Sequence, residues 1–291
     1  MKYLILGANG LIGQHAVRVC KEKNYSFTGT CFSRQSGDFV QFNQLDFESI
    51  PAFFDQVKPT VVFNAIGLAG GVNFCEENPQ TGRKYHVEST KIMADWCKKN
   101  NAIFVFISTD YVFDGQNPPY KEYDETNPLN FYGKFKLEGE HYIQETLSQY
   151  IIARTTNVFG WDPETKTPNF LMSLVLALKE KDSIPVPGFL WGNPTYAGDL
   201  VAGIIDLIEN SRFGLYHIVG PGYISRYDWA KKLLEIARIT GKAIEKQETP
   251  PPNIVPRPLK SNLNTEKFRN ASHLKLKDIE EGLQVFVSEM K

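Results

Sequence analysis

The chain has 291 residues, of which 42% are hydrophobic and 22% carry a charge, and its formal net charge is -1. These values are ordinary for a globular protein with a large core, and the length fits one domain plus a smaller one. A net charge near zero gives no electrostatic reason to expect nucleic acid or an anionic membrane as a partner.

The chain shows no pattern of export or of membrane insertion. The first apolar run, Tyr3–Leu6, is too short for a signal peptide, and the longest later run, Phe170–Leu178, is too short to span a membrane. The four cysteines and five histidines are scattered, without the spacing of metal ligands. We therefore expect reduced thiols, no metal site and a cytoplasmic location.

Strands and helices alternate along the first half of the chain. Short apolar strands are predicted at 2–6, 26–32, 60–63, 102–107 and 150–153. Helices are predicted between them, at 11–23, 50–57, about 80–99 and 132 to about 147. This alternation predicts the α/β class, with a Rossmann-type doubly wound parallel sheet covered by helices on both faces.

The second half is less regular. Helices are predicted at 170–181, 198–209 and 226–239, with turn-rich joints between them. We predict that residues 1–160 form the Rossmann domain, to which segments of about 193–220 return. Residues 161–192 and 221–291 then form a smaller C-terminal substrate-binding lobe.

The turn after the first strand carries a nucleotide signature, Gly-x-x-Gly-x-x-Gly. The first glycine allows a tight turn, the second lets the backbone approach a pyrophosphate, and the third lets the helix pack on the strand. The phosphates then lie at the helix N-terminus, where free N–H groups and the dipole favour anions. The predicted cofactor-binding residues of this turn are Gly7, Asn9, Gly10, Leu11, Ile12 and Gly13.

The end of the second strand bears on which dinucleotide binds. A carboxylate there would bind the 2′-hydroxyl of NAD, whereas an arginine accommodates a 2′-phosphate. The chain has Ser33 and Arg34 at this point and no carboxylate before Asp38. We therefore expect NADP(H) to be preferred, with NAD(H) as the alternative. The other interpretation of Arg34 is an exposed loop charge.

A tyrosine and a lysine share one face of the helix predicted from residue 132. Tyr132 and Lys136 are one turn apart, whereas Lys134 points to about the opposite side. A phenol with a pKa of about 10 is a poor acid or base at neutral pH unless its anion is stabilised, and an adjacent ammonium does this. Ser108 or Thr109, at the end of the preceding strand, can hold a substrate oxygen beside the phenol. Such Tyr/Lys spacings are common on solvated helices, so the pair gains its meaning from the glycine-rich turn.

Together, the glycine-rich turn, the run 108–115 and the Tyr132/Lys136 pair resemble the extended short-chain dehydrogenase/reductases. More narrowly, the chain resembles the dTDP-4-dehydrorhamnose reductase family, to which the run Ser-Thr-Asp-Tyr-Val-Phe-Asp-Gly is highly specific. Further segments fall in the order typical of that family: 45–47, 64–67, 75–79, 154–160, 193–195, 199–200 and 257–263.

The resemblance implies an NAD(P)H-dependent reductase of a nucleotide-linked 4-keto-6-deoxy sugar. In such an enzyme Tyr132 donates the proton, Thr109 bonds the same oxygen, and Lys136 lowers the pKa of Tyr132 and holds the nicotinamide ribose. The resemblance adds to the cofactor site Asp46, Phe47, Ala65, Ile66 and Gly67. The substrate contacts that it implies are Thr109, Asp110, Asn157 and Arg257. Asp110 has a second interpretation, as a turn residue. A homodimer is compatible with the resemblance.

Three departures concern the substrate side and the helix behind the active site. Glu88 stands where the family usually has Asn, Asn157 replaces a usual Trp, and Phe189-Leu190 replaces an Asp-Gln pair. Because an apolar wall discriminates weakly among polar ligands, we expect a different sugar or base, or looser selection among bases. The other interpretation is that Phe189 and Leu190 only pack within the lobe.

Other functions share parts of this pattern. An epimerase or dehydratase of nucleotide sugars would use the same fold and the same Tyr/Lys pair. A non-catalytic regulatory subunit resembling that of methionine adenosyltransferase, or a plain NADP(H) sensor, would not need to keep Thr109, Tyr132 and Lys136. The chain keeps all three, which favours an enzyme.

Overall fold

The computed structural model describes all residues except 33–36, 69, 164, 166 and 291. Its centre is a seven-stranded sheet in the order β11-β6-β5-β4-β1-β2-β3, and every neighbouring pair is parallel. The strands are β1 (Lys2–Leu6), β2 (Ser26–Cys31), β3 (Val40–Gln41), β4 (Val61–Asn64), β5 (Ile103–Thr109), β6 (Tyr150–Thr155) and β11 (Gly214–His217). The predicted doubly wound α/β fold is therefore confirmed.

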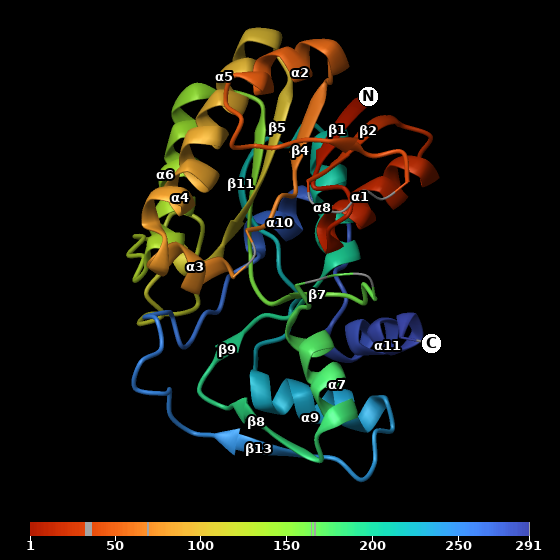
Figure 1. The fold of residues 1–291 in the computed structure, drawn as a ribbon, viewed down its shortest axis with the longest axis vertical. Helices are drawn as coiled ribbons and strands as arrows, with labels where there is room; N and C mark the ends of the chain where they lie inside the picture. The colour runs from red at the N-terminus through yellow and green to blue at the C-terminus, as the bar shows by residue number, and fades with distance from the viewer. Residues whose placement is uncertain (33–36, 69, 164, 166, 291) are drawn as a thin grey trace.

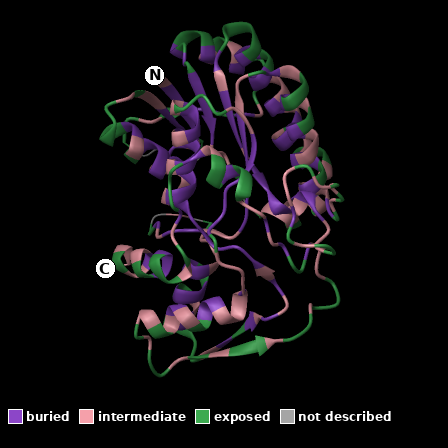
Figure 2. Ribbon diagram, turned by 180° about the vertical axis from the view of Figure 1, so that it is seen from behind, coloured by how far each residue is buried: buried purple, intermediate pink, exposed green. Residues whose placement is uncertain are grey.

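Helices cover both faces of the sheet (Figure 1). One face carries α1 (Leu11–Glu22) and α8 (Ala197–Glu209), which pack against each other. The other face carries α2 (Ser49–Val57), α5 (Ser89–Asn100) and α6 (Phe131–Thr146). Because both faces are covered, the central strands are buried along their length (Figure 2), which explains their continuous apolar sequences.

The chain between β4 and α5 is less simple than the single helix predicted at about 80–99. It forms α3 (Gly71–Glu77), α4 (Pro79–Arg83) and a π-helical turn at Lys84–Glu88 that leads directly into α5. A π turn holds one more residue than an α turn, so it changes which side chains face inward, and such turns are frequent at functional sites.

A smaller lobe lies below the carboxyl ends of the strands in Figure 1. Its helices are α7 (Phe170–Glu180), α9 (Arg226–Ile236) and α11 (Ile279–Glu289), which pack around the buried Trp229. Its strands are β8 (Ser183–Pro187) with β13 (Ala243–Gln247) and β9 (Trp191–Gly192) with β12 (Ile224–Ser225). Between the two parts, β7 (Val158–Phe159) pairs with β10 (Thr195–Tyr196).

One helix of the segment assigned to this lobe lies elsewhere. The prediction placed all of 221–291 in the substrate lobe, but α10 (Glu266–Ala271) packs on the sheet half, where Phe268 shares a core with α8. The physical reason is that α8 leaves space at Gly203, against which the ring of Phe268 packs. The chain therefore crosses between the two parts more often than predicted.

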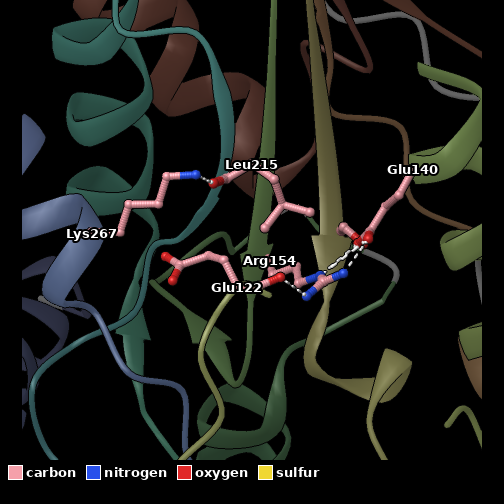
Figure 3. Close-up of polar contacts among 6 residues, drawn as sticks. Glu122, Glu140, Arg154, Leu215 and Lys267 are labelled. Atoms are coloured by element: carbon pink, nitrogen blue, oxygen red, sulfur yellow. Dashed lines mark hydrogen bonds and ion pairs between the residues drawn. The ribbon is translucent and has the colours of Figure 1, made fainter. Parts of the chain in front are cut away.

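Side chains cover the free edge of β11. The carboxylate of Glu122 accepts the N–H of His217 at 2.9 Å. Lys267 Nζ donates to the carbonyl of Leu215 at 2.7 Å (Figure 3). A sheet edge with its backbone groups satisfied in this way is a poor template for pairing with another chain. Within the described residues, no helix is long and apolar enough to cross a membrane.

Candidate active site

The strand order reverses between β1 and β4, so the crevice at their carboxyl ends is the expected ligand site of such a sheet. The glycine-rich turn lies there. Gly7 has φ +74°, and a Cβ atom on Gly13 would come within 2.1 Å of the Gly7 carbonyl oxygen. Both positions therefore require glycine, as the sequence predicted.

The N-terminus of α1 has the features of an anion-binding site. Its N-cap is Gly10, which has no side chain to cap the first N–H groups, and the residues described in its first turn include no acidic one. The turn is fixed to β2 because Thr30 Oγ1 accepts the N–H of Gly7 at 3.2 Å. A pyrophosphate fits this position by charge and by donors.

A cavity of about 460 Å³ opens over this turn. It is lined by Gly7, Asn9 and Gly10, by residues 30–32 and 42–44, and by residues 65–68. The predicted Asp46 and Phe47 are not among its lining residues; Asp46 is exposed and Phe47 packs on the core, while Asn43 and Gln44 face the cavity instead. The predicted Ser33 and Arg34 lie outside the described residues.

A second cavity, of about 400 Å³, shares residues 65–68 with the first. It is lined by the predicted residues Ile12, Ala65, Ile66, Gly67, Thr109, Asp110, Tyr132, Lys136 and Asn157. The fold thus brings the Tyr/Lys pair to the end of β5, beside the predicted cofactor site. Leu11 and Gly13 lie in the first turn of α1, outside the lining of either cavity.

Lys136 points inward and Lys134 outward, as their spacing predicted. Lys136 is 7% exposed, and its Nζ donates to the carbonyl of Ile107 at 2.9 Å and lies 4.5 Å from the centre of the Phe106 ring. Burial lowers the pKa of Lys136 to about 8, so it is still mainly protonated at neutral pH. Lys134 is exposed.

The phenol of Tyr132 does not follow the expectation that its pKa is lowered. Burial raises the pKa of Tyr132, the negative charge of Asp110 raises it further, and the Thr109 hydroxyl acts in the opposite direction. The reason is that burial is the largest of these effects and the Asp110 charge adds to it. A raised pKa keeps Tyr132 in its protonated form, which is the form that a proton donor needs.

Asp110 is buried in the same wall. It is 4% exposed, and Thr109 Oγ1 donates to its Oδ1 at 3.2 Å. Burial raises the pKa of this carboxyl, and the neighbouring hydroxyls of Ser261, Thr156 and Thr109 oppose the rise. Both interpretations of Asp110 therefore have a physical basis, since it begins a 3₁₀ turn and also lines the cavity.

The opposite wall contains an arginine that the sequence analysis missed. Arg226 is the first residue of α9 and lines the cavity; its Nη2 lies 3.5 Å from Asn157 Oδ1, and its guanidinium carbon lies 5.1 Å from the Phe170 ring centre. No carboxylate of the described residues forms an ion pair with it. A cation in the first turn of a helix opposes the helix dipole, and this unfavourable placement is the sequence signal that could have identified Arg226.

Asn157 and Arg257 flank Arg226. Asn157 has φ +47°, a conformation that Asn adopts more readily than Trp. Arg257 donates from Nη2 to Asn73 Oδ1 at 3.1 Å and lies outside the cavity lining, although its charge, like that of Arg226, acts on the partly buried Tyr111, which lines the cavity. The structure therefore gathers two arginines around the mouth of the site.

The π-helical turn places His86, and not Glu88, on the cavity wall. His86 is 3% exposed, its ring packs edge-on against Tyr132 at 5.4 Å between centres, and its Nε2 has no hydrogen-bond partner among the described residues. Glu88 is half-exposed and lies 3.8 Å from Arg83. Sequence spacing could not find His86, because the extra residue of the turn shifts the inward face.

The substrate-side pair Phe189-Leu190 lies away from the cavity. Leu190 is 8% exposed and packs within the lobe, where its carbonyl accepts the N–H of Arg226, and Phe189 is half-buried. Neither side chain lines the two cavities described above. Of the changes on the substrate side, Asn157 is the one that faces the site.

Known proteins resemble this chain over most of its length. The family model described as RmlD substrate binding domain matches residues 1–291. The dTDP-4-dehydrorhamnose reductase of Escherichia coli is 32% identical over 255 residues, 84% of each chain. Methionine adenosyltransferase 2 subunit beta of Xenopus tropicalis is 27% identical over 271 residues, 91% of this chain and 80% of the other.

Among solved structures, the fold is similar to dTDP-4-dehydrorhamnose reductase from Bacillus anthracis in complex with NADP. The TM-score is 0.88 at 26% identity, with 100% of this chain and 99% of the other covered.

Proposed function

The chain belongs to the RmlD substrate binding domain family, and from that membership we propose that it is an NADPH-dependent reductase of a nucleotide-linked 4-keto-6-deoxy sugar. The observation that carries the proposal is the continuity of the two cavities through residues 65–68. One cavity lies over an anion-binding helix N-terminus, and the other holds Thr109, Tyr132 and Lys136.

The residues of the second cavity fit the reduction of a ketone. A bound nicotinamide cofactor supplies the hydride to the carbonyl carbon. Tyr132 donates its phenolic proton to the carbonyl oxygen, so that the C=O group becomes an alcohol and the phenol becomes a phenolate. Thr109 hydrogen-bonds the same oxygen, and the ammonium of Lys136 stabilises the phenolate that remains.

The protonation states agree with this direction of reaction. The raised pKa of Tyr132 keeps the proton available, whereas a general base would need a lowered one. Lys136, with a pKa of about 8, carries its charge at neutral pH. Asp110 is the second polar group that we assign to the sugar, because it lines the cavity next to Thr109.

The substrate wall fits an anionic ligand. Arg226 reaches the cavity without a carboxylate partner among the described residues, and Arg257 lies near it. Guanidinium groups bind phosphate oxygens through charge-assisted hydrogen bonds. We assign the diphosphate of the nucleotide sugar to this wall and the choice of sugar or base to Asn157.

The test is turnover of NADPH with dTDP-, UDP- and GDP-linked 4-keto-6-deoxyhexoses, followed by NADPH absorbance, with Tyr132→Phe as the matched control. We expect oxidation of NADPH with at least one of these sugars in the unmutated protein and loss of it in the variant. No oxidation with any of them would overturn the proposal.

The same experiment separates the alternatives. Conversion of a nucleotide sugar to its epimer without net NADPH oxidation would identify an epimerase. NADPH binding with no turnover of any sugar would identify a regulatory subunit or a sensor. The retention of Thr109, Tyr132 and Lys136 around one cavity is the observation that favours the reductase.

A further inference from the structure

A buried ion pair lies next to the catalytic cavity, joining α6 to β6. Arg154 Nη2 lies 2.7 Å from Glu140 Oε2, and Arg154 Nε donates to both carboxylate oxygens at 3.1 Å (Figure 3). The side chain of Glu140 is 0% exposed and that of Arg154 is 4% exposed. Neither group lines the cavity, so the chemistry described above does not use them.

The place of Glu140 connects it to the catalytic residues. Tyr132, Lys136 and Glu140 follow one another at four-residue spacing on one face of α6. The Ser108 hydroxyl donates to Glu140, and Ser108 directly precedes Thr109 on β5. The carboxylate therefore shares a helix with the proton donor and bonds the strand that carries the other hydroxyl of the site.

Arg154 is held from the other side. Its Nη1 donates to the Glu122 carbonyl at 3.3 Å, and its guanidinium carbon lies 5.1 Å from the Phe113 ring centre. The side chain of Glu122 in turn caps the edge strand at His217. Each of the three guanidinium nitrogens thus has a hydrogen-bond partner, and α6, β5 and β6 are linked to one another at the catalytic end of the sheet.

Stability alone does not account for a pair of this kind. Well-packed apolar residues often replace a buried ion pair without loss of stability, whereas removing one partner is costly. The charge has a further effect, because Cys75 and, to a smaller extent, Glu140 oppose the lowering of the Lys136 pKa by burial.

The other titratable groups that interact with Lys136 are Cys75 of α3 and His86 of the π turn, and Tyr132 lies one turn before it on α6. Burial raises the pKa of Cys75 to about 11, so that thiol is neutral near pH 8. Burial and Lys136 lower the pKa of His86, so the imidazole is neutral too. Glu140 is therefore the negative charge that acts on Lys136.

We propose that Glu140 is a positioning residue for the reduction. It fixes the face of α6 that carries Tyr132 against the end of β5, and its charge stabilises the ammonium of Lys136. The inference rests on the proposed function for its kinetic part, since it concerns the proton donor of that reaction. The effects on stability and on the pKa of Lys136 are properties of the chain without substrate, so they do not depend on the proposed function.

The test compares Glu140→Gln, Glu140→Asp, Arg154→Met and the double variant Glu140→Gln/Arg154→Met. Thermal unfolding measures the stability of each, and NMR of ¹³Cε-labelled lysine measures the pKa of Lys136 without substrate. Where the sugar is turned over, kcat, KM and the alkaline limb of kcat/KM are measured as well. Glu209→Gln is the control, because Glu209 of α8 forms a hydrogen-bonded ion pair with Lys23, the C-cap of α1, away from the site.

We expect Glu140→Gln to shift the pKa of Lys136 downward by about 0.5 pH unit or more, and the alkaline limb of kcat/KM with it. Glu140→Asp keeps the charge but shortens the side chain. The pH of the alkaline limb of kcat/KM should therefore stay the same, while kcat falls. The double variant should regain much of the melting temperature lost in Arg154→Met, yet keep a low kcat with little change in KM. Glu209→Gln should lose stability only.

Two results would overturn the proposal. One is an unchanged Lys136 titration in Glu140→Gln. The other is recovery of kcat and of the pH limb together with stability in the double variant, because the pair would then be purely structural. If Glu140→Gln does not fold, Glu140→Asp and the double variant decide. If no sugar is turned over, the titration still tests Glu140, so failure of the proposed function remains distinguishable.

Discussion

Arg154 and Arg226, two of the arginines near the active site, differ in one respect that separates the two parts of the molecule. Arg154, in the sheet half, is buried against Glu140, and its Nη1 donates to the Glu122 carbonyl. Arg226, in the smaller lobe, contacts Asn157 and the Phe170 ring, and no carboxylate of the described residues pairs with it. The sheet half satisfies its own charges and so fixes geometry, while the lobe leaves a cation available for a ligand.

The largest expected effect is the loss of turnover when the proton donor of the sheet half is removed. Tyr132→Phe removes the proton donor but keeps the ring that packs on His86. We expect kcat to fall by about 10²–10⁴-fold, the usual contribution of a general acid. NADPH affinity and the melting temperature should stay close to those of the unmutated protein. A normally active variant would place the acid elsewhere, with His86 the next candidate because it lines the same cavity.

The next prediction tests the contrast between the arginines directly. Arg226→Met should raise KM for the nucleotide sugar by about 10–100-fold, the equivalent of ~1.5–3 kcal/mol for a charge-assisted hydrogen bond. Its melting temperature should not fall, because no ion pair is broken. Arg154→Met should instead lose ~3–5 kcal/mol of stability, since it leaves Glu140 buried without its partner.

The measurements are Michaelis kinetics and thermal unfolding, with Arg269→Met as an exposed control on α10. A loss of stability in Arg226→Met equal to that in Arg154→Met would remove the distinction between the two halves.

The third prediction concerns the stability of the folded protein at acidic pH. The three buried histidines, His15, His86 and His217, all lie in the sheet half, and burial lowers the pKa of His15 to about 4 and of His217 to about 3. Because the folded-state pKa lies below that of the unfolded chain, about 6.5, the unfolded state binds more protons between these values. Their stabilising contribution is therefore complete above about pH 6.5 and is lost as the pH falls.

The expected slope is about 1.4 kcal/mol per pH unit for each such histidine. Between about pH 6 and 4, His217→Asn should reduce the slope of the unfolding free energy against pH by the amount that corresponds to one bound proton. Urea unfolding at several pH values measures this slope. His273→Asn, on an exposed residue, should leave the slope unchanged. An identical slope in both variants would contradict this prediction.

The smallest expected effect concerns the cofactor. If Ser33 and Arg34 hold a 2′-phosphate, NADPH should bind more tightly than NADH. Arg34→Ala should then narrow the difference by about tenfold, which corresponds to ~1.5 kcal/mol. Equilibrium binding of both cofactors checks this, with Arg18→Ala as a control on α1. Equal dissociation constants in the unmutated protein would refute it.

Much of the fold and part of the site could be predicted from the sequence. The strands at 2–6, 26–32 and 150–153 and the helix from Tyr132 lie close to their predicted bounds. The inward orientation of Lys136 followed from its spacing, and Gly7 and Gly13 of the first turn occupy positions that require glycine. Each of these depends on hydrophobic period, turn chemistry or helix geometry, which neighbours in the sequence determine.

The rest was decided by segments far apart in the chain. Arg226 reaches the cavity because the lobe folds back under the sheet, and His86 faces it because of a π turn. The pKa of Tyr132 moves upward because burial and Asp110 outweigh any ammonium, which no spacing could reveal. Side-chain period is a local property, whereas burial, charge pairing and the choice of an inward residue depend on what packs against it. The sequence by itself therefore determined the sheet and the catalytic face, and only the tertiary structure decided the electrostatics of the site and the wall that meets the substrate.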